Sequence, residues 1–144
     1  MKFIDSHCHL QMTAFRKNLK QILDNARTAG VQSIINVGFD LRSSEEAVEL
    51  AQKYQFMYAA VGIHPHDAKT YDNHTLKILE GFLSDPHVVA IGETGLDYKR
   101  NLSPPSIQKS VFTEQLVFAK EKEVTSFISM VPRILESSPA LACG

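Results

Sequence analysis

The 144-residue sequence is poor in cysteine, in net charge and in long apolar runs, and each shortage excludes a class of protein. Its two cysteines, Cys8 and Cys143, lie near opposite ends of the chain, which argues against a disulfide scaffold and favours a reducing compartment. The formal net charge is −1, so no overall basic field drives nucleic-acid binding. No apolar run approaches the length of a membrane span, and the N-terminus begins directly with a strand-like segment. We therefore expect a cytoplasmic protein without membrane contact.

The remaining composition is that of a folded domain. With 44% hydrophobic residues, a chain of this length can bury one good core, so we expect residues 1–144 to form a single domain. Near-continuous apolar segments alternate with segments of helical periodicity. The expected strands are 3–10, 33–37, 57–61 and 88–91, and the expected helices are 13–29, 43–54, 76–83 and 105–119.

Local signals set the ends of these helices. Gly30 is placed to end the first helix, and Ser43 with Glu46 matches a capping box that opens the second. Gln108 and Gln115 interrupt the apolar stripe of the last helix, and we expect both amides near its rim. A strand and a helix repeated every 25 to 30 residues are typical of parallel βα units.

Two histidines separated by one residue end the first expected strand. Because strand side chains alternate between faces, His7 and His9 share one face, about 6 to 7 Å apart along the backbone, while Cys8 faces away. Neutral imidazole is the commonest protein ligand for divalent metals. The pair is a candidate metal site, although chance polarity on a half-exposed strand explains a lone His-x-His equally well.

Polar groups also follow two later strands. His64 and His66 flank Pro65 after the third, and Glu93 and Asp97 follow the fourth. Parallel strands place their sites at their carboxyl ends, and three of four strands ending in candidate residues favours a barrel over an open sheet. We expect a structural role for Asp97.

Three stretches, Asp5–Leu10, Gly62–His66 and Ala90–Tyr98, together resemble the TatD family of metal-dependent deoxyribonucleases. The resemblance covers residues 1 to about 122. It implies a (β/α)8 TIM barrel that binds two divalent cations. It also implies that the activity is hydrolysis of phosphodiester bonds and that the substrate is DNA. A barrel of eight units needs roughly 250 residues, so this chain holds four to five units.

The resemblance also implies roles for single residues. His7 and His9 match ligands of the first metal, Glu93 matches the carboxylate that bridges both metals, and His64 and His66 match residues near the substrate phosphate. Two imidazoles and a carboxylate suit Zn²⁺, Mn²⁺ or Mg²⁺. Lys99 and Arg100 either touch phosphate or form a plain solvated pair; the sequence leaves both open.

The chain departs from the family after Glu123. No histidine follows His87, so the family's second-metal histidines and late aspartate have no counterpart, and residues 124–144 form a divergent tail. We expect a truncated, spliced or frameshifted product that holds at most one metal well and self-associates through an exposed sheet edge. The alternatives to an active nuclease are a catalytically impaired metal-binding or partner-binding product, and another metal-barrel hydrolase such as a deaminase or lactonase. The second and third motifs disfavour the last.

Overall fold

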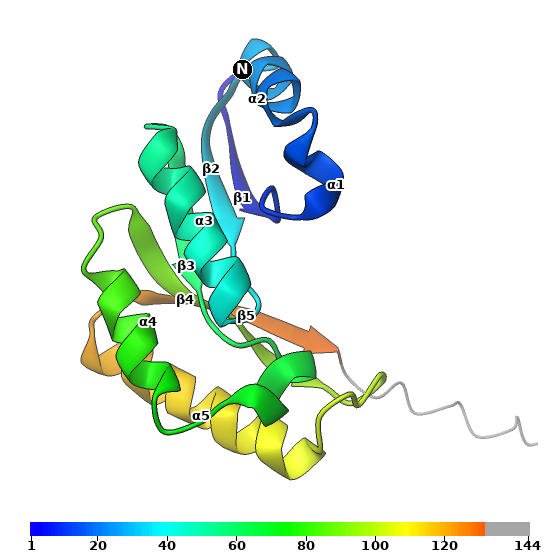
Figure 1. Cartoon of the computed structure of the whole chain (residues 1–144), viewed down its shortest axis with the longest axis vertical. Helices are drawn as coiled ribbons and strands as arrows, with labels where there is room; N and C mark the ends of the chain where they lie inside the picture. Colours follow the sequence, from blue (N-terminus) through cyan, green and yellow to red (C-terminus); the bar gives the residue numbers. More distant parts are fainter. Residues whose placement is uncertain (132–144) are drawn as a thin grey trace, which may run out of the picture.

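A computed structural model describes residues 1–131 and arranges them around one curved sheet of five parallel strands (Figure 1). Each strand pairs with the next in the chain, in the order β1-β2-β3-β4-β5. The strands are β1 (Phe3–Cys8), β2 (Val31–Val37), β3 (Met57–Val61), β4 (Val88–Asp97) and β5 (Thr125–Val131). The sheet curls like half of a barrel, which confirms the predicted α/β fold of four to five βα units.

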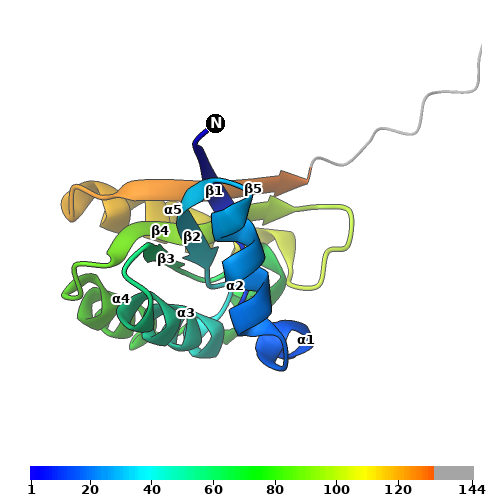
Figure 2. The same ribbon diagram turned by 90° about the horizontal axis from the view of Figure 1, so that it is seen from above.

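Helices connect the strands and lie along the outside of the curved sheet (Figure 2). They are α1 (Thr13–Arg16), α2 (Leu19–Thr28), α3 (Leu41–Lys53), the 3-10 helix η1 (Pro65–Thr70), α4 (Thr75–Leu83) and α5 (Pro105–Glu121). Among the described residues, none of these helices combines the length and the apolar character needed to cross a membrane.

The strands bury opposite faces against different partners. On β3, Met57, Ala59 and Val61 are fully buried in the main core, which also contains Leu79 of α4. Ala60 points to the other face, where it packs with Val37 of β2 and Ala90 of β4. This alternation follows from the two-residue period of a strand. Four of the five residues of β3 are therefore buried, and only Tyr58, on the Ala60 face, is partly exposed.

The prediction of one continuous helix over residues 13–29 is wrong. The structure breaks residues 13–29 into α1 and α2, because Asn18 adopts φ −121° and ψ 13°, outside the helical region. Asparagine side chains compete with the backbone for hydrogen bonds and so weaken helix interiors. The break lets the chain turn between the end of β1 and the outside of the sheet.

The predicted capping box of α3 is displaced by three residues. Asp40, not Ser43, is the N-cap: its Oδ1 accepts the Ser43 N–H at 2.6 Å, and Ser43 Oγ accepts the Asp40 N–H at 3.0 Å. Aspartate caps helices at least as well as serine, so the earlier residue takes the position. Glu46 instead pairs with Arg16 and Arg42.

Strand β4 is longer than the sequence predicted. It continues past Ile91 to Asp97, so Glu93 lies within the sheet and not in a loop. Gly95 has φ +150° and lies so close to β5 that an added Cβ would be 1.7 Å from the Ser129 carbonyl oxygen. Only glycine permits this approach. β5 pairs in parallel beside β4.

Both glutamines of α5 are buried, which corrects their expected place near the rim. Gln108 and Gln115 are 1% and 0% exposed. Gln115 accepts the Ile63 N–H at 2.8 Å and donates to the Ile63 carbonyl and to Thr94 Oγ1. A buried amide needs such partners, and here they tie α5 to the ends of β3 and β4.

The outer strands of the described sheet, β1 and β5, each have one neighbour. Self-association through such an edge stays a prediction. So do the single domain over residues 1–144 and the divergent tail at 124–144, since residues 132–144, with Cys143, lie outside the described part.

Candidate metal centre

The two histidines at the end of the first strand, His7 within β1 and His9 just after it, share one face, as predicted. His7 Nε2 and His9 Nε2 lie 3.3 Å apart. Cys8 between them turns the other way, with its Sγ 3.6 Å from the Ile35 carbonyl oxygen and its side chain against the main core. Burial raises the pKa of the Cys8 thiol to about 12. The thiol is therefore a packing group and not a ligand.

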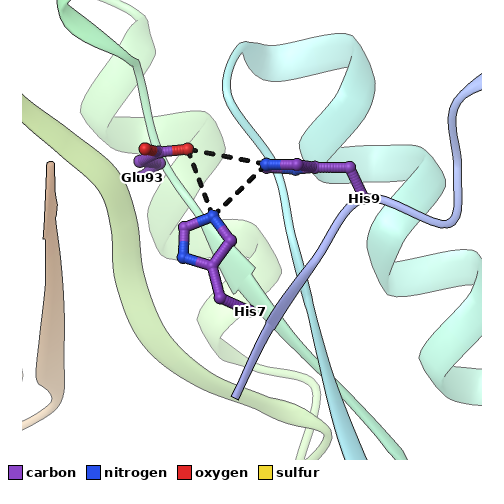
Figure 3. A group of neighbouring side chains, drawn as sticks. All are labelled: His7, His9 and Glu93. Carbon is purple, nitrogen blue, oxygen red and sulfur yellow. Dashed lines mark hydrogen bonds and ion pairs between the residues drawn. The ribbon is translucent and has the colours of Figure 1, made fainter. Parts of the chain in front are cut away.

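Glu93 of β4 faces both imidazoles (Figure 3). Its Oε2 lies 3.4 Å from His7 Nε2 and 3.7 Å from His9 Nε2. Within residues 1–131, these three side chains form the only group of three or more His, Cys, Asp or Glu residues whose ligand atoms come close enough to hold one metal ion. The curved sheet therefore brings side chains from the end of β1 and from the middle of β4 together.

The hydrogen bonding of His9 suits a metal ligand. Its Nδ1 lies 2.7 Å from the Val37 carbonyl oxygen, which can only accept, so Nδ1 carries a proton. In the neutral imidazole with this tautomer, the lone pair is on Nε2, the nitrogen that faces Glu93 and His7. Ligands about 2.1 Å from a tetrahedral ion would lie roughly 3.4 Å apart. The observed separations of 3.3–3.7 Å fit a divalent cation.

Three successive carbonyl groups at the end of β2 hold these residues in place. Val37 accepts from His9, Gly38 accepts the Glu93 N–H at 2.8 Å, and Phe39 accepts the His64 N–H at 2.8 Å. Backbone carbonyls on a strand end are rigid acceptors, so they fix the approach of all three groups. We call Val37–Phe39 the carbonyl ladder.

The predicted substrate residues lie beside the cluster. His64 Nε2 is 3.7 Å from Glu93 Oε1, the oxygen that faces away from the His7 and His9 pair. Its Nδ1 accepts the His66 N–H. Burial lowers the pKa of His64 although the Glu93 carboxylate opposes that change, so the imidazole is neutral at pH 7. The structure thus brings all five predicted residues to one end of the sheet.

Asp97 is buried and organises the loop after β4. It accepts from His66 Nε2 at 2.5 Å and from the backbone N–H groups of Lys99 and Arg100 at 2.9 Å. Burial by itself raises the pKa of this carboxyl, but the bonds from Arg100, His66 and Lys99 outweigh it and hold the pKa below its usual value. This is the hydrogen-bonding role expected of Asp97.

Supporting residues were missed by sequence reasoning. Asn36 is fully buried, and its Oδ1 accepts the Leu10 N–H at 2.7 Å just after the two histidines. Gln115 holds Ile63, the residue before His64. A polar residue inside an apolar strand or helix stripe was the available signal. The side chains of Lys99 and Arg100 are exposed, and both readings of them stay open.

A cluster of two imidazoles and a carboxylate at the carboxyl end of curved parallel βα units is the arrangement of metal-dependent α/β-barrel hydrolases. Residues 4–128 match the family model of TatD related DNases. The chain belongs to this family.

Individual relatives agree with this membership. The chain is 39% identical over 117 residues to an uncharacterized metal-dependent hydrolase, YabD, of Bacillus subtilis, covering 81% of this chain and 46% of the relative. It is 36% identical over 124 residues to the 3'-5' ssDNA/RNA exonuclease TatD of Cronobacter turicensis, covering 86% of this chain and 47% of the relative. The chain thus spans about half the length of these curated relatives.

Solved structures repeat the fold. The TatD homolog YJJV from Escherichia coli superposes with a TM-score of 0.79 at 32% identity, over 88% of this chain and 49% of that one. A TatD family hydrolase from Entamoeba histolytica superposes with a TM-score of 0.74 at 25% identity, over 85% and 47%. The five strands therefore correspond to about half of a family member.

The carbonyl ladder gives a first test. A Cβ added to Gly38 would lie 2.3 Å from Ser44 Oγ and 2.5 Å from Ser44 Cα, so Gly38→Ala must displace the ladder. We expect a loss of roughly 1–3 kcal/mol in the free energy of unfolding and weaker cation binding. Gly81→Ala is the control, because no atom lies within 4 Å of a Cβ added there. Alanine inside α4 should raise the free energy of unfolding by about 0.5–1 kcal/mol. A Gly38→Ala protein with unchanged stability and cation affinity would contradict the ladder's role.

Asp97 gives a second, pH-dependent test. A carboxyl whose pKa is lowered by folding stabilises the protein above its unfolded pKa of about 3.9, and this stabilisation disappears as the pH falls through the folded-state pKa. We expect Asp97→Asn to lower the free energy of unfolding at pH 7 and to lose that effect at acid pH. Denaturant titrations at several pH values measure it, with exposed Asp24→Asn as control. A difference that stays constant with pH would refute this reading.

Proposed function

We propose that the chain provides a divalent-cation site, with His7, His9 and Glu93 as ligands, for the hydrolysis of phosphodiester bonds in DNA. The observation that carries the proposal is the convergence of two imidazole nitrogens and one carboxylate oxygen within 3.3–3.7 Å. Membership of the TatD related DNase family supports the reaction class. A relative named as an ssDNA/RNA exonuclease supports a nucleic-acid substrate.

The ligand set suits Mn²⁺, Zn²⁺ or, with additional waters, Mg²⁺. A divalent cation held there supplies Lewis-acid activation of water and neutralises charge on a phosphodiester. Glu93 would hold a cation through Oε2, which faces the two imidazoles, while Oε1 faces His64 on the side of the proposed substrate. One carboxylate can thereby serve two positions in the site.

The neighbouring histidines would hold the substrate. Neutral His64 accepts at Nδ1 from the backbone, so its proton lies on Nε2, on the cluster side, and can be donated to a phosphate oxygen. His66 is held by Asp97, which keeps its ring in one orientation. These two side chains would orient the phosphodiester, while Glu93 and the β1 histidines hold the cation.

A second candidate is that this chain alone holds one cation without turning DNA over. It is favoured by the absence, within residues 1–131, of a second cluster able to hold a metal. A two-cation site clamps the attacking and the leaving oxygen, and a single cation leaves that clamp incomplete. Cleavage of labelled single-stranded DNA, with and without EDTA and with Glu93→Gln, separates the two candidates. EDTA-sensitive cleavage that Glu93→Gln abolishes supports the nuclease.

Cation binding itself is predicted to depend on His7. Calorimetry with Mn²⁺ and Zn²⁺ should detect one site, and His7→Ala should weaken it by roughly 100-fold or more, because losses in supporting partners alone cost 10–100-fold. His74→Ala is the matched control, since His74 lies at the start of α4, outside the cluster. Equal affinities of the two variants would contradict the assignment of the ligands.

A further inference from the structure

A cavity of about 260 Å³ lies next to the candidate metal centre, between the loops that follow β1 and β2. Gln11 and Met12 line it from the first loop, and Phe39 lines it from the second. Arg16, Arg42 and Glu46 complete its polar side. Its volume is a little below the range of about 300–1,000 Å³ typical of pockets for drug-sized ligands, so it suits a single planar ring system.

Two contacts connect this cavity to the metal cluster. The Phe39 ring stands edge-on to His9, with the centroids 5.7 Å apart. Gln11 Nε2 and His9 Nδ1 bond to the same Val37 carbonyl, at 2.8 and 2.7 Å. A group in the cavity therefore lies one side chain away from a proposed ligand.

The charges of the cavity argue against a phosphate as its occupant. Both guanidinium groups are paired to one carboxylate oxygen, Arg16 at 2.9 Å and Arg42 at 3.2 Å from Glu46 Oε1. Asp40 also lines the cavity, so two positive and two negative side chains balance. An anion would gain little there, whereas an uncharged group with donor and acceptor edges meets partners of both kinds.

Gln11 supplies an unused acceptor. The residue is 4% exposed, its Nε2 is bonded to Val37, and its Oε1 accepts no hydrogen bond within the described part of the chain. A buried amide oxygen without a partner is costly. Because Gln11 lines the cavity, a small rotation of its side chain would present this oxygen to an exocyclic amine of a base. Phe39 and Met12 add the apolar wall on which a base can stack.

We propose that this cavity binds the nucleobase of a nucleotide next to the scissile phosphodiester. The cavity is thus a base subsite of the proposed nuclease, on which this inference rests. Base recognition beside the metal cluster would favour unpaired strands, because a base in a duplex cannot leave its stack without an energetic cost.

The test is binding without turnover. The full chain, labelled with ¹⁵N and kept in EDTA, is titrated with a deoxyadenosine trinucleotide, with the same backbone carrying abasic positions, and with inorganic phosphate. We expect the trinucleotide to shift the amide signals of Gln11, Met12 and Phe39 and to bind roughly tenfold more tightly than the abasic probe. Equal binding of both probes, equal shifts with phosphate, or no binding of the trinucleotide would overturn the proposal.

Variants separate stacking from folding. Phe39→Leu should weaken binding of the trinucleotide about fivefold or more and leave binding of the abasic probe unchanged, because only a base stacks on the Phe39 ring. If Phe39→Leu does not fold, Met12→Ala is read in the same way, with Ile78→Ala of α4 as a control of similar exposure. Equal losses for both probes would overturn the base subsite. A chain that binds bases but never cleaves DNA would refute the nuclease alone, and cleavage without base-dependent binding would refute the subsite alone.

Discussion

The candidate site depends on three consecutive carbonyl groups, those of Val37, Gly38 and Phe39. The Val37 carbonyl holds the His9 imidazole, while the Gly38 and Phe39 carbonyls accept the backbone N–H groups of Glu93, within β4, and His64, after β3. Such bonds fix the His9 ring directly and fix the backbone from which the Glu93 and His64 side chains project. The segment at the end of β2 thus positions the residues of the cluster. Ser44, near the start of α3, packs against Gly38 and fixes this segment in turn.

Much of this fold was predictable because parallel βα units leave a strong local pattern. Alternation along a strand placed His7 and His9 on one face with Cys8 opposite, and the described structure agrees. The extension of β4 through Glu93 was not predictable in the same way. Gly92 and Gly95 ordinarily signal a loop. Here glycine is needed because β5, a strand distant in sequence, approaches the β4 backbone too closely for a Cβ.

The supporting contacts were hidden for a related reason. Gln115 and Asn36 look like breaks in apolar stripes, and only the folded chain supplies their partners at Ile63 and Leu10. Asp40 and Ser43 both carry side chains that can cap a helix, but the local sequence did not decide which of them is the N-cap of α3. Helix and strand identity are local properties, whereas the satisfaction of buried polar groups depends on contacts between elements.

The central claim is that His7, His9 and Glu93 share one divalent cation. The most direct measurement is an anomalous difference map from a crystal of this chain grown with Mn²⁺. We expect one peak about 2.0–2.3 Å from His7 Nε2, His9 Nε2 and a Glu93 carboxylate oxygen. A map in which Mn²⁺ is bound elsewhere, or in which these three side chains remain without a peak at saturating Mn²⁺, would contradict it.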